Sequence, residues 1–259
     1  MCRAVRLIAI FVAAGVLTEA VASAQTLDEL IVKNLEAKGG LETLRATTTV
    51  KMTGRFKTEG VEMPMTTWAK RPNQWRREAD VPPPPMMTPR PGEKPQRQKM
   101  VTASDGTTAW TMMGSMPPQT LSGPQADAMK NNAEFESLFV DYQQKGYSIA
   151  LVGKETIQGK PVYHLRVTRK NAPGQDFYLD ADTGLETRIV IDDVDPAGGS
   201  VHVETELSDY RKVQGRMVPF RTRQSMRQPD GTRTAEMSLE AIEFNLPLED
   251  SMFRIPSGK

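Results

Sequence analysis

Few residues of this chain have the types and spacing that metal or nucleophile chemistry requires. The sequence holds two histidines, His164 and His202, and one cysteine, Cys2. Without a His-x-x-x-His pair or a second cysteine, it supports no zinc site. Each histidine stands on the polar phase of an alternating run, so we expect both on the solvent face of a strand.

Catalytic motifs are also absent from the sequence. It contains no Gly-x-Ser-x-Gly elbow, no phosphate-binding glycine loop and no Cys–His pair. A carboxylate pair for hydrolysis needs no local motif, and nothing in the sequence selects one. We therefore expect a protein without enzyme activity and without a cofactor, and an envelope hydrolase stays a minor alternative.

Two runs of aspartates come close to a calcium-binding pattern. Neither run has the twelve-residue loop with a terminal Glu that this ion favours. Asp and Gly are also preferred turn residues, so we expect turns there and no metal site. The runs are Asp176, Asp180 and Asp182 and, further on, Asp192, Asp193 and Asp195.

Methionine is the residue type that indicates binding. The chain has 15 Met, whereas aromatic residues make up only 6%. Thioether side chains repack around varied guests, so Met on the apolar phase of strands favours an adaptable cavity. Plain core packing is an equal alternative, and a copper(I) site at residues 112–116 is a third. The residues concerned are Met52, Met63, Met65, Met112 and Met237.

Residues 1–24 have the pattern of a cleaved secretory signal peptide. Arg3 and Arg6 precede the apolar stretch 7–17, and Ala22-Ser23-Ala24 offers small residues for cleavage. That stretch is too short to span a membrane, and no later apolar run reaches about 18 residues. We expect residues 25–259 to form a single periplasmic domain that does not span the membrane.

Charge and cysteine content narrow the function class. The chain has 33 Lys+Arg and 32 Asp+Glu, a net charge of +1. Nucleic-acid binding needs a basic face, which a balanced chain does not supply, so we expect no nucleic-acid partner. Cleavage after residue 24 would leave no cysteine, which suits an oxidising compartment.

Helix signals occur at two places. Thr26-Leu27-Asp28-Glu29 is a capping box, and a helix from there is predicted to end at Gly39-Gly40. Ser122, with Gln125 three residues later, predicts a second helix over 122–145. Its apolar stripe consists of Met129, Phe135, Leu138, Phe139 and Tyr142.

The rest of the chain is typical of strands. Alternation begins near residue 46, and explicit turns such as Glu59-Gly60, Asp105-Gly106 and Gln214-Gly215 separate the runs. About a dozen strands in meander order predict a mainly antiparallel β-sheet, with two β-sandwiches split near residue 120 as the alternative. The proline-rich segment 81–97 interrupts the pattern, which predicts an extended flap or, alternatively, a partner-binding motif.

The order of these elements resembles the LolA/LolB-like family of periplasmic outer-membrane lipoprotein-sorting proteins. The resemblance covers residues 25–259 and rests on moderately specific motifs. They are Lys38-Gly39-Gly40, the run from Thr48 to Gly54, Asp105-Gly106 with Trp110, Tyr178-Leu179-Asp180 with Thr183-Gly184-Leu185, and Val218-Pro219-Phe220.

The resemblance implies a curved, incomplete β-barrel with a helical lid over an apolar cavity. It implies a non-catalytic carrier that shields lipid or lipoprotein acyl chains, the 122–145 helix serving as the lid. The alternative is an envelope sensor or scaffold that binds a protein partner through the proline-rich flap or a sheet edge. The expected cavity wall consists of Met52, Phe56, Met63, Met65, Trp110, Met112, Phe135, Leu138, Phe139, Ile189, Ile191 and Val203.

Overall fold

A computed structural model describes residues 25–83, 96–170, 172–194 and 200–256. The expected signal peptide and most of the proline-rich flap lie outside these residues. Within the described ranges, no helix is both long enough and apolar enough to cross a membrane.

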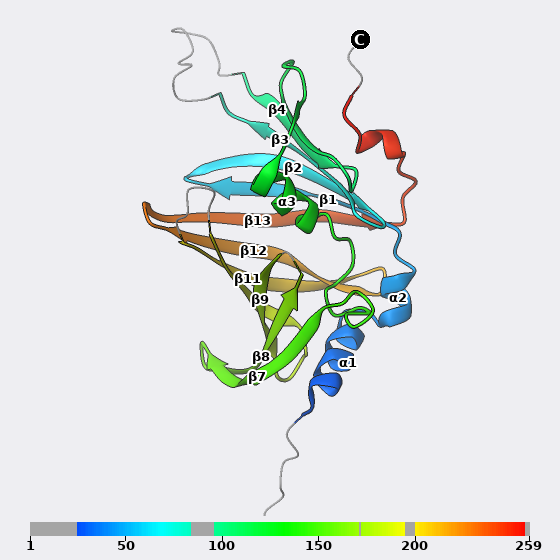
Figure 1. Ribbon diagram of the computed structural model, residues 1–259, viewed down its shortest axis with the longest axis vertical. Coiled ribbons are helices and arrows are strands. Elements are labelled where there is room, and N and C mark those ends of the chain that lie inside the picture. Colours follow the sequence, from blue (N-terminus) through cyan, green and yellow to red (C-terminus); the bar gives the residue numbers. More distant parts are fainter. Residues whose placement is uncertain (1–24, 84–95, 171, 195–199, 257–259) are drawn as a thin grey trace, which may run out of the picture.

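A single antiparallel sheet of 13 strands forms the body of the molecule (Figure 1). The sheet is strongly curved and is not closed, so it forms an open half-barrel, as predicted. The strands are β1 (Thr49–Thr58), β2 (Val61–Lys70), β3 (Gln74–Val81), β4 (Gln98–Ser104), β5 (Ala109–Met113), β6 (Gln119–Thr120), β7 (Ser148–Ile157), β8 (Lys160–Arg169), β9 (Ala172–Asp180), β10 (Glu186–Val194), β11 (Ser200–Val213), β12 (Arg216–Gln228) and β13 (Gly231–Phe244).

The strand order departs from a simple meander at one place. Strands β1 to β6 run from the middle of the sheet to one edge, and β7 to β13 run back from the other edge. Strand β13 then pairs with β1, Met52 lying opposite Ile242. One sheet therefore joins both halves of the chain, and the alternative of two sandwiches split near residue 120 is wrong.

Helix α1 (Leu27–Ala37) begins at the predicted capping box. Thr26 accepts a hydrogen bond from the backbone of Glu29, whose carboxylate accepts one from the Thr26 backbone. The next helix, α2 (Leu41–Arg45), follows directly.

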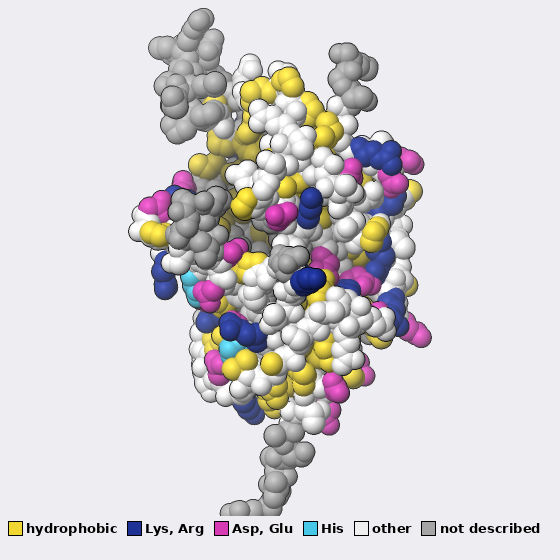
Figure 2. All heavy atoms as spheres, in the orientation of Figure 1, with side chains coloured by type: hydrophobic (Ala, Val, Ile, Leu, Met, Phe, Trp, Pro, Cys, Tyr) yellow, Lys and Arg dark blue, Asp and Glu magenta, His cyan; other side chains and the backbone are white. Residues whose placement is uncertain are grey.

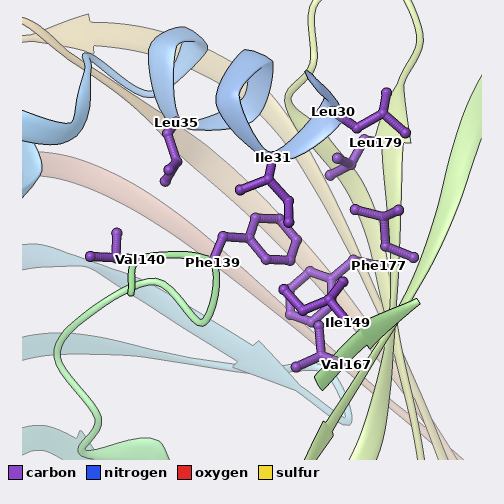
Figure 3. Packing of buried hydrophobic residues seen from close by; sticks show 10 residues of the cluster. Leu30, Ile31, Leu35, Phe139, Val140, Ile149, Val167, Phe177 and Leu179 are labelled. Carbon is purple, nitrogen blue, oxygen red and sulfur yellow. The ribbon is translucent and has the colours of Figure 1, made fainter. Parts of the chain in front are cut away.

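The apolar side of α1 faces the sheet and forms the largest core (Figure 3). Ile31 lies above Phe139 and Phe177, whose ring centroids are 5.1 Å apart. Asn34, also buried, donates from Nδ2 to the carbonyl oxygen of Gly184 at 2.8 Å. These contacts fix α1 across strands β7 to β9.

The second predicted helix is shorter than expected. Helix α3 spans Gly123–Asn132 and contacts β4 and β5, whereas residues 133–147 form a series of turns. We call these residues the closing segment. Ser137 accepts a hydrogen bond from the backbone of Phe139, and Asp141 has a φ of 51°. Local side-chain bonds of this kind compete with helix, so the prediction of a lid helix over 122–145 is wrong beyond residue 132.

Candidate functional site: an apolar pocket in the half-barrel

A pocket of about 380 Å³ opens beside the closing segment. It lies between the end of α1, α2, strands β1, β12 and β13, and the turns around residue 136. Most of the exposed surface inside it is apolar. The lining residues are Lys38, Leu44, Thr47, Val50, Arg71, Phe135, Glu136, Ser137, Val140, Arg216, Met217, Val218, Pro219, Ile242 and Phe244.

Strand alternation supplies the apolar wall. Val50, Ile242 and Phe244 share one face because Val50 pairs with Phe244 and Met52 with Ile242. Val218 and Phe220 of β12 belong to the same apolar cluster. This wall is continuous with the concave face of the sheet. An apolar ligand bound there would be shielded from water.

Arg71 links the closing segment to the rest of the pocket. Its guanidinium pairs with Glu136 and donates from Nε to the carbonyl oxygen of Thr47 at 2.6 Å and from Nη2 to that of Leu44 at 2.9 Å. It also lies 5.0 Å from the ring centroid of Phe135. One side chain therefore joins the β2–β3 turn, the α2 region and the closing segment.

Glu136 is held as a carboxylate. Its burial raises the pKa of the carboxyl group, but hydrogen bonds and charge from Arg71, with a contribution from Lys145, outweigh this effect. The pKa of Glu136 therefore lies below its usual value, and the ion pair persists at neutral pH.

Arg216 forms the deeper polar part of the pocket. Its guanidinium donates from Nε to Thr47 Oγ1 at 2.8 Å and from Nη1 to the carbonyl oxygen of Gln214 at 2.8 Å. It stacks over the Phe244 ring, 4.5 Å from the centroid. Burial lowers the pKa of Arg216. With these contacts the cation is a structural part of the wall.

The predicted cavity residues divide into groups. Only one of them, Phe135, lines the apolar pocket. Phe139 is buried in the core beneath α1, and Leu138 packs against that core. The remaining concave-face residues are half-buried or, for two methionines, buried. They are Met52, Phe56, Ile189, Ile191 and Val203, and the buried pair Met63 and Met65.

The strand register places most of these residues together on the concave face of the sheet. Met52 pairs with Thr67 and Phe56 pairs with Met63 across β1 and β2. On the other half, Ile191 pairs with Val203. Directly opposite residues project to the same side of an antiparallel sheet, so these side chains share a face, as the alternation predicted.

Trp110 and Met112 lie on the opposite, convex face, so their assignment to the cavity wall is wrong. Across neighbouring strands, Met65 lies opposite Ala79, Ala79 lies opposite Met100, and Met100 lies opposite Met113. Met113, rather than its neighbour Met112, therefore shares the face of Met65. Both phases of strand β5 are apolar, and alternation alone cannot choose between them.

Sequence reasoning missed most residues that line the pocket. Ile242 and Phe244 alternate with Glu243 near the end of β13, a pattern that marks an inward face. Arg71 and Arg216 carried no such signal, because a basic residue at a turn or strand start is ordinarily solvent-exposed.

In the first aspartate run, Asp180 and Asp182 take part in the predicted turn, whereas Asp176 lies within strand β9, buried and paired with Arg166, so the prediction of a turn is wrong for Asp176. Asp180 Oδ1 accepts hydrogen bonds from the backbones of Asp182 and Thr183, as Asp side chains commonly do in turns. In the second run, Asp192 and Asp193 lie within strand β10, not in a turn as predicted, and Asp195 lies outside the described residues. In the part of the chain that the structure describes, no three His, Cys, Asp or Glu residues group closely enough to hold a metal ion.

No family model matches the sequence, and no curated protein matches it. Solved structures do match. A DUF1329 family protein from Desulfovibrio piger shares 15% identity over 88% of this chain and 96% of its own, with a TM-score of 0.56.

Two further structures give the same result. A domain described as outer membrane lipoprotein-sorting, from Vibrio parahaemolyticus, shares 14% identity over 87% of this chain and 94% of its own, with a TM-score of 0.56. A LolA superfamily protein from Nitrosomonas europaea shares 14% identity over 89% of this chain and 98% of its own, with a TM-score of 0.54. The chain has the LolA-like fold.

Proposed function

We propose that the protein is a periplasmic carrier that binds the acyl chain of a lipid or lipoprotein without chemical turnover. The observation that carries this proposal is the apolar pocket between the sheet and the closing segment. Its volume lies in the range of roughly 300–1,000 Å³ that small-molecule sites occupy. The fold, shared with lipoprotein-sorting proteins, supports the same function.

Removal of the acyl chain from water would drive binding. Each buried methylene contributes about 0.8 kcal/mol, so a dozen carbons supply a gross free energy of ~10 kcal/mol. Ordering of the chain and opening of the pocket offset part of it. Release requires movement of the closing segment, which polar contacts such as Arg71–Glu136 hold in place.

The test is native mass spectrometry of gently purified protein, followed by lipid extraction. Wild-type protein is expected to carry lipid. A Val218→Glu variant should lose it, because the carboxylate would project among the apolar side chains of the pocket. Thr53→Glu is the control, since Thr53 points away from the concave face and pairs with Thr66. Absence of lipid from wild type, or equal retention by Val218→Glu, would contradict the carrier.

A second candidate is an envelope module that binds a protein partner through a sheet edge. Strand β7 is an edge strand with exposed Leu151 and Val152, the latter 56% exposed. An edge of this kind can accept an added strand from another chain. A photo-crosslinker at Val152 that captured one envelope protein, with no lipid extracted, would favour this candidate over the carrier.

A further inference from the structure

A second pocket, of about 330 Å³, lies on the other side of the closing segment. Phe135 and Glu136 face the apolar pocket, whereas Glu134 lines this second one. The β2–β3 turn separates the two pockets in the same way, with Arg71 on the apolar side and Pro72 on the other. The two pockets therefore adjoin across a thin wall.

The second pocket is cationic. Four of its lining residues are basic, Lys130, Lys145, Arg169 and Lys170, and one is acidic, Glu134. This excess contrasts with the balanced charge of the whole chain. On the face shown in Figure 2, basic and acidic side chains are interspersed. We call it the cationic pocket.

Protein groups already neutralise Glu134. Its carboxylate oxygens lie 3.2 Å from Lys145 Nζ and 3.3 Å from Arg169 Nη1, and they accept a hydrogen bond from the Tyr147 hydroxyl at 3.1 Å. Within the described ranges, neither Lys130 nor Lys170 forms an ion pair, and both are exposed. Two cations of the pocket are therefore available to a ligand.

Arg169 brings a largely buried guanidinium to the lining of the pocket. Its side chain is only 6% exposed, and its Nε has no hydrogen-bond acceptor among the described residues. A buried guanidinium N–H without an acceptor is costly, and an anion in the pocket could supply one. Its fixed planar donors suit oxyanions with several oxygens.

We propose that the cationic pocket binds a phosphate group. A phosphate offers several acceptor oxygens and up to two negative charges, which matches a buried guanidinium flanked by two unpaired lysines. The group can belong to a lipid headgroup, whose chains would enter the adjoining apolar pocket, or to a free phosphoester. The lipid source rests on the proposed function, whereas the phosphate site does not.

Calorimetry with soluble phosphates tests the site itself. Inorganic phosphate and glycerol phosphate are titrated into wild type and into the double variant Lys130→Glu/Lys170→Glu. We expect wild-type binding that weakens with added salt, and at least a tenfold loss in the variant. The matched control is Lys154→Glu/Lys212→Glu, which changes the net charge equally at exposed positions outside the pocket. No binding by wild type, or equal loss in both double variants, would overturn the proposal.

Vesicles separate the two sources of phosphate. Phosphatidylcholine vesicles with and without phosphatidic acid are incubated with each protein, and extracted lipid is measured. Preferential uptake of phosphatidic acid that Lys130→Glu/Lys170→Glu abolishes identifies a headgroup site. Binding of soluble phosphate without such preference identifies a free phosphoester. Val218→Glu should lose acyl retention but keep phosphate binding, so failure of the carrier and failure of the phosphate site are distinguishable.

Discussion

The indole nitrogen of Trp110 donates a hydrogen bond of 2.8 Å to the backbone carbonyl of Phe253, 143 residues further along the chain. Both side chains are fully buried. Arg76 adds a bond from Nη1 to the carbonyl oxygen of Met252 at 2.7 Å and lies 5.6 Å from the Trp110 ring. The C-terminal turn, Asp250–Met252, thus covers the convex side of strands β3 to β5.

This contact predicts a strong effect of Phe253→Ala. Loss of a fully buried phenyl ring should lower the free energy of unfolding by about 3–4 kcal/mol, because a cavity replaces it. Chemical denaturation measures the loss. Ile255→Ala is the control, since Ile255 is 39% exposed and should change stability by less than about 1 kcal/mol. Equal effects of the two variants would mean that the C-terminal turn does not seal the convex face.

Arg71→Leu should loosen the closing segment. The substitution removes the pair with Glu136, whose side chain is 20% exposed, together with two bonds to backbone carbonyls. We expect the free energy of unfolding to fall by about 1–3 kcal/mol. This is less than for a fully buried pair, because both partners are partly solvated. Hydrogen exchange over residues 133–147 should become faster.

The exposed pair Arg45–Asp141 provides a matched comparison. It ties α2 to the same segment at 2.5 Å, but the Arg45 side chain is 51% exposed. Arg45→Leu should therefore lower the free energy of unfolding by less than about 1 kcal/mol. If Arg45→Leu speeds exchange as much as Arg71→Leu does, Arg71 has no special part in holding the segment.

The pH dependence of stability, compared between wild type and Glu136→Gln, should reveal the Arg71–Glu136 ion pair. Because the folded-state pKa of Glu136 is lowered below the usual 4.5, its contribution to stability is present above that pH. The contribution is lost as the pH falls through the folded-state pKa. Wild type should exceed Glu136→Gln in stability at pH 7, and the difference should shrink below about pH 4. A constant difference across that window would contradict the ion pair.

Local signals predicted much of this fold, because turns are local. Glu59-Gly60 and Gln214-Gly215 both have positive φ angles at their two residues, as tight hairpin turns require. The alternating runs and their bounding turns predict strands over 160–169, 200–213 and 216–228, and strands β8, β11 and β12 span these same ranges. Each of these features depends on residues that are neighbours in the sequence.

Features that depend on distant residues could not be predicted in this way. The pairing of β1 with β13 joins residues near 52 and 242, and no local pattern indicates it. The face of Trp110 is decided by Phe253, which covers one side of a strand that is apolar on both. The apolar pocket likewise depends on where the irregular closing segment lies.

Arg77 is the final case, a cation on the concave face. It pairs in register with Thr67, and its Nε donates to the Thr67 hydroxyl at 3.3 Å. The guanidinium also lies 4.9 Å from the Trp75 ring centroid. Among the described residues it forms no ion pair, and burial lowers the pKa of Arg77. A charge that is desolvated without a carboxylate partner reduces stability.

Arg77→Met should therefore leave the free energy of unfolding unchanged or raise it by about 1 kcal/mol, since an apolar side chain of similar length replaces a poorly compensated charge. Arg216→Met is the contrasting variant. It removes a guanidinium with three acceptors, Thr47, Gln214 and Thr43, and should cost about 2–3 kcal/mol. Urea denaturation of both variants and of wild type measures these changes in the free energy of unfolding. A loss for Arg77→Met as large as that for Arg216→Met would show that the concave-face cation is stabilised as fully as the one in the pocket wall.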